Sequence, residues 1–126
     1  MIMLVNKLVR DNVPDLIKNE YGKGYAYVTI PDDNTYREAL THILLEEVHD
    51  LVNILRTNHH KKNALINEIV DIREILKAII ILEHLDMDNI LLHQKEKREK
   101  KGGYRNRIFL KEVIERGDKY GQGKSN

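Results

Sequence analysis

The chain is short, nearly neutral and free of cysteine, and these properties exclude several classes of protein. It has 126 residues, of which 41% are hydrophobic and 33% are charged, and its formal net charge is +1. This composition is typical of one globular domain with a single core rather than of a disordered chain. Without cysteine, neither a disulfide framework nor a thiolate metal site is possible.

No segment has the pattern of a targeting signal or of a membrane span. The apolar run at residues 1–5 ends at Asn6 and Lys7, which makes it too short for a signal peptide. The most apolar stretch, residues 78–82, is far shorter than the roughly 20 residues needed to cross a bilayer. We therefore expect a soluble cytoplasmic protein.

The first half of the chain predicts a short helix, an extended segment and a long helix. Asp11 or Asn12 can cap a helix that has Pro14 in its first turn and ends near Gly22. Residues 25–30, "YAYVTI", are β-branched and aromatic, and predict a short strand or an extended arm. The capping-box pattern Thr35-x-x-Glu38 predicts the start of a helix that runs to about Arg56.

The second half predicts two further helices, over residues 63–85 and 88–101, the latter ended by Gly102-Gly103. Residues 104–115 are ambiguous between strand and helix, and residues 117–126 have the composition of a disordered tail. We predict a mainly all-α fold in one domain over residues 1–116, an antiparallel helical bundle with short extended segments.

Carboxylates interrupt the apolar faces of both long helices. At about 100° per residue, Glu47 and Asp50 fall among the apolar residues of the first, and Glu46 lies at their edge. Glu68 and Asp71 take similar positions on the second. The polar turn at residues 57–62 predicts antiparallel helices, and Asp50 and Glu68 both lie about 8–9 Å from it.

The two acidic pairs, Glu47 with Asp50 and Glu68 with Asp71, are therefore expected to face each other across the seam between the helices. Four unpaired carboxylates in that position are unfavourable, because burying a charge costs several kcal/mol per ion. A divalent cation removes the conflict, and oxygen ligands suit Mg²⁺ or Mn²⁺. The alternative is that each carboxylate is a salt-bridged or partly solvated residue without a metal.

Three blocks of the sequence resemble one family. Glu46-Glu47-x-x-Asp50, then 17 residues, then Glu68-x-x-Asp71 resembles the EExxE…ExxD signature of the all-α nucleoside triphosphate pyrophosphohydrolases. This superfamily comprises the MazG-like proteins and phosphoribosyl-ATP pyrophosphohydrolase. "NKLVRDNVPDLI" at residues 6–17 is similar to the KLVRDxIP opening of one of its subfamilies, and "KREKKGGYRNRIFL" at 97–110 to the same subfamily's ending.

The resemblance implies a MazG-like helical bundle built from dimers, with Mg²⁺ held by Glu47, Asp50, Glu68 and Asp71. It implies hydrolysis of a nucleotide between the α- and β-phosphates to a monophosphate and pyrophosphate. Lys7, Arg10 and Asp11 carry over as substrate-pocket residues. The sequence departs from the family at Asp50, Lys101 and Tyr104, where Glu, Arg and Phe are usual. Asp50 is one methylene shorter than the residue it replaces.

Other candidate residues follow from their positions. Glu46 is a candidate to orient or deprotonate the attacking water, with a surface role as the alternative. Residues 95–111 contain eight Lys or Arg against two Glu. Within this run Lys97 and Lys101 share a helix face and, with Arg105, are candidates to bind phosphate, unless they form only a solvated helix end. Tyr104 is a candidate to stack on a base, with core packing as the alternative.

Rival functions have weaker support. Glu46-x-x-His49 matches one element of a di-iron carboxylate bundle, but the second element is missing because Asp71, not His, follows Glu68. A nucleic-acid binder is disfavoured by the near-neutral charge and the acidic seam. A non-catalytic helical interaction module, or a degenerate relative of the enzymes, stays open.

The sequence also predicts self-association. The helix over residues 63–85 is apolar almost all round, since Ile66, Ile80 and Ile81 lie outside the face that carries Glu68. Such a helix needs cover on more than one side. We expect a homodimer or a dimer of dimers that acts on a nucleotide.

Overall fold

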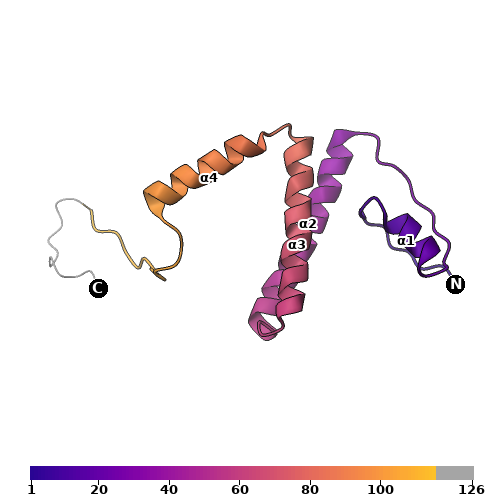
Figure 1. Cartoon of the computed structure of the whole chain (residues 1–126), viewed down its shortest axis with the longest axis horizontal. Coiled ribbons are helices and arrows are strands. Elements are labelled where there is room, and N and C mark those ends of the chain that lie inside the picture. The colour runs from indigo at the N-terminus through magenta and orange to yellow at the C-terminus, as the bar shows by residue number, and fades with distance from the viewer. Residues whose placement is uncertain (116–126) are drawn as a thin grey trace. The chain divides into compact units, whose positions relative to one another are not determined.

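The computed structural model describes residues 1–115 and is all-α over that range, as the sequence predicts. Its four helices are α1 (Val13–Asn19), α2 (Asp33–Thr57), α3 (Lys62–Leu82) and α4 (Met87–Lys101), coloured along the chain in Figure 1. The chain divides into two compact units, Met1–Met87 and a second that begins at Asp88. The single domain over residues 1–116 stays a prediction, and the predicted tail at 117–126 lies outside the described residues.

The long helix α2 begins earlier than its predicted capping box. Asp32 is its N-cap residue, and the Asp32 carboxylate accepts a hydrogen bond of 2.8 Å from the backbone N–H of Thr35. This bond lowers the pKa of Asp32, because it stabilises the ionised carboxylate. The prediction that Thr35 opens the helix was wrong, because the aspartate three residues earlier occupies the cap and Thr35 supplies one of the helix's free N–H groups.

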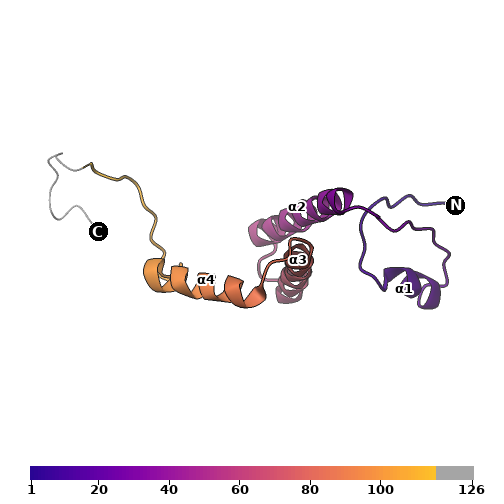
Figure 2. The same ribbon diagram turned by 90° about the horizontal axis from the view of Figure 1, so that it is seen from above.

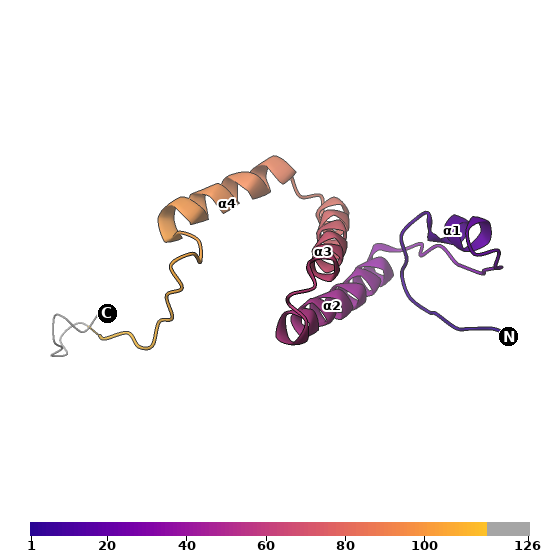
Figure 3. The ribbon, with the colours of Figure 1, turned by 60° about the horizontal axis from the view of Figure 1, so that its bottom comes forward.

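Helices α2 and α3 form an antiparallel hairpin and lie side by side in all three views (Figures 1, 2 and 3). The connection is tight: the N–H of Asn58 bonds to the carbonyl of Ile54, and the N–H of Lys61 to that of Asn58. Leu40 of α2 and Ile75 of α3 are the buried apolar residues of the described chain. The predicted pairing of these helices is therefore observed, whereas a larger bundle stays a prediction.

The open end of the hairpin is fixed by an ion pair and by a left-handed residue. Arg37, in the second turn of α2, donates from Nε to Glu83 Oε1 at 3.1 Å, and Glu83 is the C-cap residue of α3. His84 follows with φ of +55°, and its N–H bonds to Ile81 while the N–H of Leu85 bonds to Ile80. These two bonds form a Schellman motif, in which histidine occupies the position where glycine is usual.

The short first helix and the segment after it differ from the prediction in detail. α1 ends at Asn19, three residues before the predicted end at Gly22, and Asn12 caps it without a side-chain hydrogen bond. Residues 25–30 form neither helix nor strand in the described chain, so the strand alternative was wrong, and the alternative of an extended arm stays a prediction. Tyr25 and Tyr27 stack on each other with ring centroids 5.8 Å apart. This local contact uses the aromatic residues that suggested a strand.

The second unit begins at Asp88 and holds α4 apart from its first residue, Met87. Gly102 ends α4 with φ of +80°, and its N–H bonds to the carbonyl of Arg98, so the predicted glycine stop is observed. Residues 104–115 form neither helix nor strand, and the choice between those two was therefore wrong. The segment instead exposes its large apolar side chains, among them Ile108 at 82% and Phe109 at 86%.

Among the described residues, no helix is both long enough and apolar enough to cross a membrane.

Candidate functional site

Carboxylates from α2 and α3 converge in the seam of the hairpin. Glu47, Asp50 and Glu68 each offer an oxygen within 4.8 Å of the others. The i,i+3 spacing places Glu47 and Asp50 on one face of α2, and the antiparallel return brings Glu68 of α3 to the same height. Three of the four predicted metal ligands therefore lie together, and we call them the acidic triad.

Glu68 is the member of the triad whose environment is least suited to a charge. Its side chain is half-buried, and its Oε2 atom is buried without a hydrogen-bond partner. The pKa of Glu68 rises from an ordinary 4.5 to about 7. The largest cause is the neighbouring Glu47 carboxylate, to which a protonated Glu68 can donate a hydrogen bond, followed by burial and by the negative charges of Glu47, Asp50 and Asp71.

Asp71, the fourth predicted ligand, is paired with a basic residue instead. Arg10 donates from Nη2 to Asp71 Oδ1 at 2.8 Å, and both side chains are about half exposed. Asp71 is not within the triad's mutual range of 4.8 Å. Its carboxylate still adds negative charge to the seam, since it contributes to the raised pKa of Glu68.

A second basic residue of the N-terminal arm contacts the same acidic surface. Lys7 Nζ lies 3.7 Å from Glu46 Oε1, and both side chains are more than 40% exposed. The two predicted pocket residues Lys7 and Arg10 thus lie beside carboxylates of α2 and α3, although about 40 and 60 residues separate the partners in sequence. Sequence periodicity cannot identify such contacts, because the arm is irregular.

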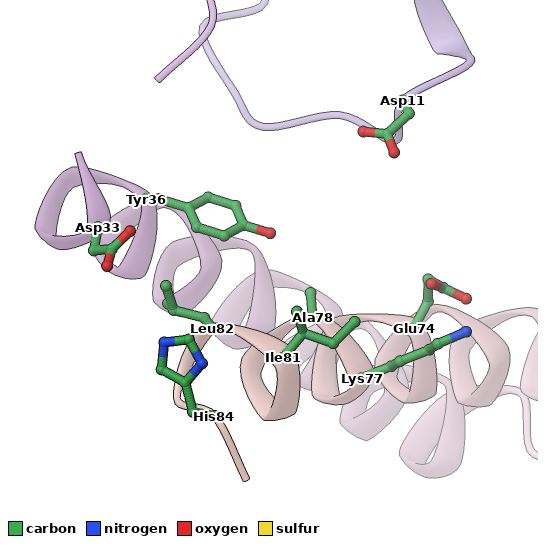
Figure 4. Close-up of a pocket in the computed structure, with 9 residues that line it drawn as sticks. All are labelled: Asp11, Asp33, Tyr36, Glu74, Lys77, Ala78, Ile81, Leu82 and His84. Atoms are coloured by element: carbon green, nitrogen blue, oxygen red, sulfur yellow. The ribbon is translucent and has the colours of Figure 1, made fainter. Parts of the chain in front are cut away.

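A groove of about 440 Å³ lies along the hairpin toward its open end, between α3, the start of α2 and the N-terminal arm (Figure 4). Its apolar floor consists of Ala78, Ile81 and Leu82 of α3. Its polar rim combines residues from the N-terminal arm and from both helices, namely Asp11, Asp33, Tyr36, Glu74, Lys77 and His84. Of these, only Asp11 was predicted as a pocket residue.

The remaining predicted substrate residues lie in the second unit. Lys97, Lys101, Tyr104 and Arg105 are all exposed, and the Tyr104 side chain is 99% exposed. The predicted alternative of core packing for Tyr104 was therefore wrong in the described chain. Lys101, Tyr104 and Arg105 line a shallow hollow that continues to Ile108. Their role in binding phosphate or a base stays a prediction.

No protein-family model, curated protein or solved structure matches this chain.

Proposed function

We propose that the protein is a Mg²⁺-dependent nucleotide pyrophosphohydrolase of the MazG-like type, which cleaves between the α- and β-phosphates of a nucleoside triphosphate or a phosphoribosyl nucleotide. The observation that carries the proposal is the acidic triad with the buried, unpartnered Oε2 of Glu68. The resemblance of the residues around the triad to the EExxE…ExxD signature supports it.

The donor set fits a hard divalent cation. Glu47, Asp50 and Glu68 would hold the ion through carboxylate oxygens, which Mg²⁺ and Mn²⁺ prefer, and Asp71 would complete the set from the next turn of α3. A bound ion would neutralise phosphate charge and lower the pKa of a bound water. The partner that Glu68 Oε2 lacks is thereby supplied, and the need for a proton on Glu68 disappears.

The charged residues beside the triad fit the other requirements of the reaction. Glu46, at the edge of the triad's face, is our candidate to orient or deprotonate the attacking water. Lys7 and Arg10 pair with Glu46 and Asp71 in the described structure. Once a cation neutralises the carboxylates, both side chains can turn to the phosphates, and the planar guanidinium of Arg10 suits two phosphate oxygens at once.

The proposed enzyme acts as a homodimer or a dimer of dimers. Within the described chain only Leu40 and Ile75 are buried apolar residues, whereas many large apolar side chains of α2 and α3 are more than 40% exposed. Exposed apolar surface on this scale marks an interaction site. A second copy would cover it and complete the helical bundle.

The test is product analysis with the full chain in millimolar Mg²⁺. A panel of canonical, deoxy, modified and phosphoribosyl nucleotides should include at least one that yields a monophosphate and pyrophosphate. Glu47→Gln should abolish the release, and Glu38→Gln, an exposed change on the same helix, should not. Release of orthophosphate in place of pyrophosphate would contradict the proposed reaction.

The second candidate is a non-catalytic helical interaction module or a degenerate relative, which the exposed apolar side chains also fit. The two candidates differ in their response to the cation. A ligand that binds only the folded state must stabilise it, so Mg²⁺ should raise the melting temperature of the enzyme. An unchanged melting temperature in millimolar Mg²⁺ would favour the interaction module.

A further inference from the structure

One end of the groove lies near Asp71, which adds negative charge to the acidic triad. Asp71, Glu74 and Ala78 follow one another at helical spacings of three and four residues, so they lie on one stripe of the helix. The floor residue Ala78 is about 10 Å along the axis from Asp71. Asp11, on the opposite rim, is the neighbour of Arg10, which bonds to Asp71. The near end of the groove therefore adjoins the proposed phosphate site.

The charges of the groove exclude the phosphates from it. Asp11, Asp33 and Glu74 contribute three carboxylates to the rim, against Lys77 and His84. A triphosphate would be repelled there, whereas an uncharged group with hydrogen-bond donors would be favoured. The part of a nucleotide that meets these conditions is the nucleoside.

The two ends of the groove suit the two parts of a nucleoside. Figure 4 shows Asp11 and Glu74 toward one end, and Tyr36, Asp33 and His84 toward the other. At the end near Asp71, Asp11 and Glu74 offer carboxylate oxygens that can accept hydrogen bonds from sugar hydroxyls. At the other end, the half-buried ring of Tyr36 stands beside the apolar floor with Asp33 and His84 at the rim. A base can stack on the ring while Asp33 accepts a hydrogen bond from its exocyclic amino group.

The backbone at this end is also unusual. His84 lines the groove and is held in the left-handed region, at φ of +55°, in a motif where glycine is usual. This conformation belongs to the C-terminal cap of α3, and the cap places His84 at this end of the groove.

We infer that this groove binds the nucleoside of the substrate, with the sugar at Asp11 and Glu74 and an amino-bearing base between Tyr36 and Asp33. The inference rests on the proposed function, because the triad fixes which end of the groove meets the phosphates. It adds a specificity: adenine or cytosine should be preferred to hypoxanthine or uracil, which present a carbonyl oxygen to the Asp33 carboxylate.

The binding test needs neither metal nor turnover. Adenosine and inosine are titrated into the isotope-labelled full chain, and cytidine and uridine serve as a second matched pair. The amino-bearing member of at least one pair should shift the NMR signals of Ala78, Ile81 and His84 and bind about tenfold more tightly than its carbonyl partner. Equal affinities within both pairs, or no shift at these residues, would overturn the inference.

Two variants test whether Tyr36 and Asp33 contact the base. Tyr36→Leu keeps an apolar side chain but removes the stacking surface, and should weaken adenosine binding about tenfold. Asp33→Asn offers an amide N–H to a carbonyl base and should reduce the preference for the amino-bearing nucleoside. The control is Tyr27→Leu, because Tyr27 is 66% exposed and lies outside the groove. An affinity unchanged by Tyr36→Leu would contradict the stacking role.

The same variants separate this inference from the proposed reaction. Pyrophosphate release whose KM is unchanged in Tyr36→Leu and Asp33→Asn would overturn the nucleoside site and leave the reaction in place. Adenosine or cytidine bound in the groove, without pyrophosphate release from any nucleotide, would support the site and contradict the reaction.

Discussion

Glu68 combines features that oppose one another in a protein without a bound cation. Its Oε2 atom is buried without a partner, and one of its carboxylate oxygens lies within 4.8 Å of oxygens of Glu47 and Asp50. The raised pKa of about 7 means that the folded protein relieves this repulsion by holding a proton. A cation and a proton therefore compete for the same oxygen atoms, and two predictions follow from that competition.

The first concerns pH. The folded state keeps the proton of Glu68 up to a pH of about 7, whereas its ordinary pKa is 4.5, so the folded state binds more protons between these values. The free energy of unfolding of the metal-free protein should therefore fall as pH rises through this window, and level off above it. Melting temperatures in EDTA from pH 4.5 to 8 measure this effect. The melting temperature of Glu68→Gln should depend less steeply on pH than that of the wild type. Equal pH dependence in the two proteins would show that another group is responsible.

The second concerns the charge itself. Glu68→Gln removes a negative charge and keeps the shape of the side chain, so at pH 8 the metal-free variant should be at least as stable as the wild type. Stabilisation by Mg²⁺ and pyrophosphate release should both be lost. Glu38→Gln should change stability by no more than about 0.5 kcal/mol, as is typical of surface positions. A strongly destabilised Glu68→Gln with normal turnover would indicate a structural salt bridge.

At the scale of residues, the sequence indicates the triad but not the groove. Glu47, Asp50 and Glu68 could be predicted because helical periodicity and a short turn determine both their face and their height. The bond from Arg10 to Asp71 could not, because it spans 61 residues and begins in an irregular arm. Tyr36 and His84 carry no motif, and they become neighbours of one groove only through the pairing of the hairpin ends.

At the scale of elements, the left-handed residue that caps α3 leads to a prediction about stability. His84→Gly should raise the free energy of unfolding by about 0.5–1 kcal/mol, because glycine adopts the left-handed conformation without strain but is more flexible when unfolded. Gly102→Ala is the matched change in the opposite direction. The φ of Gly102 is +80°, so the added side chain should destabilise the end of α4. Thermal denaturation and amide exchange measure the two changes. A lower free energy of unfolding in His84→Gly would mean that contacts of the imidazole stabilise the fold by more than the left-handed conformation destabilises it.

The same elements show where local sequence rules fail. The long helices were predictable because long periodic segments permit few alternatives. The predicted end of α4 at Gly102 agrees with the structure, whereas the short helix α1 ends three residues before Gly22. The start of α2 was misplaced because Asp32 and Thr35 both satisfy the pattern of a cap, and the observed bond from Thr35 selects Asp32. Residues 25–30 have the composition of a strand, but a strand needs a partner, and none of the described residues provides one.

At the scale of the whole molecule, the apolar residues exceed what one chain covers. Along α2, Leu45, Val48, Val52 and Leu55 form a stripe at spacings of three and four residues, with exposed fractions of 66%, 40%, 37% and 51%. On α3, Ile66, Ile69, Val70 and Leu76 are 45–56% exposed. A stripe of this kind on a helix predicts packing against another helix. In the proposed dimer, the stripe on α2 is the natural contact with the second copy.

The last prediction is that association and folding are linked through this stripe. The wild-type protein should have at least twice the mass of one chain by light scattering at micromolar concentration, and its melting temperature should rise with protein concentration. Val48→Lys introduces a charge into the middle of the stripe, so it should shift the protein toward monomer and lower the melting temperature. Asn63→Lys adds the same charge at an exposed polar position of α3 and should change neither. A wild-type monomer with a concentration-independent, cooperative transition would contradict the dimer, because Leu40 and Ile75 would then have to hold the hairpin together with little other buried apolar surface.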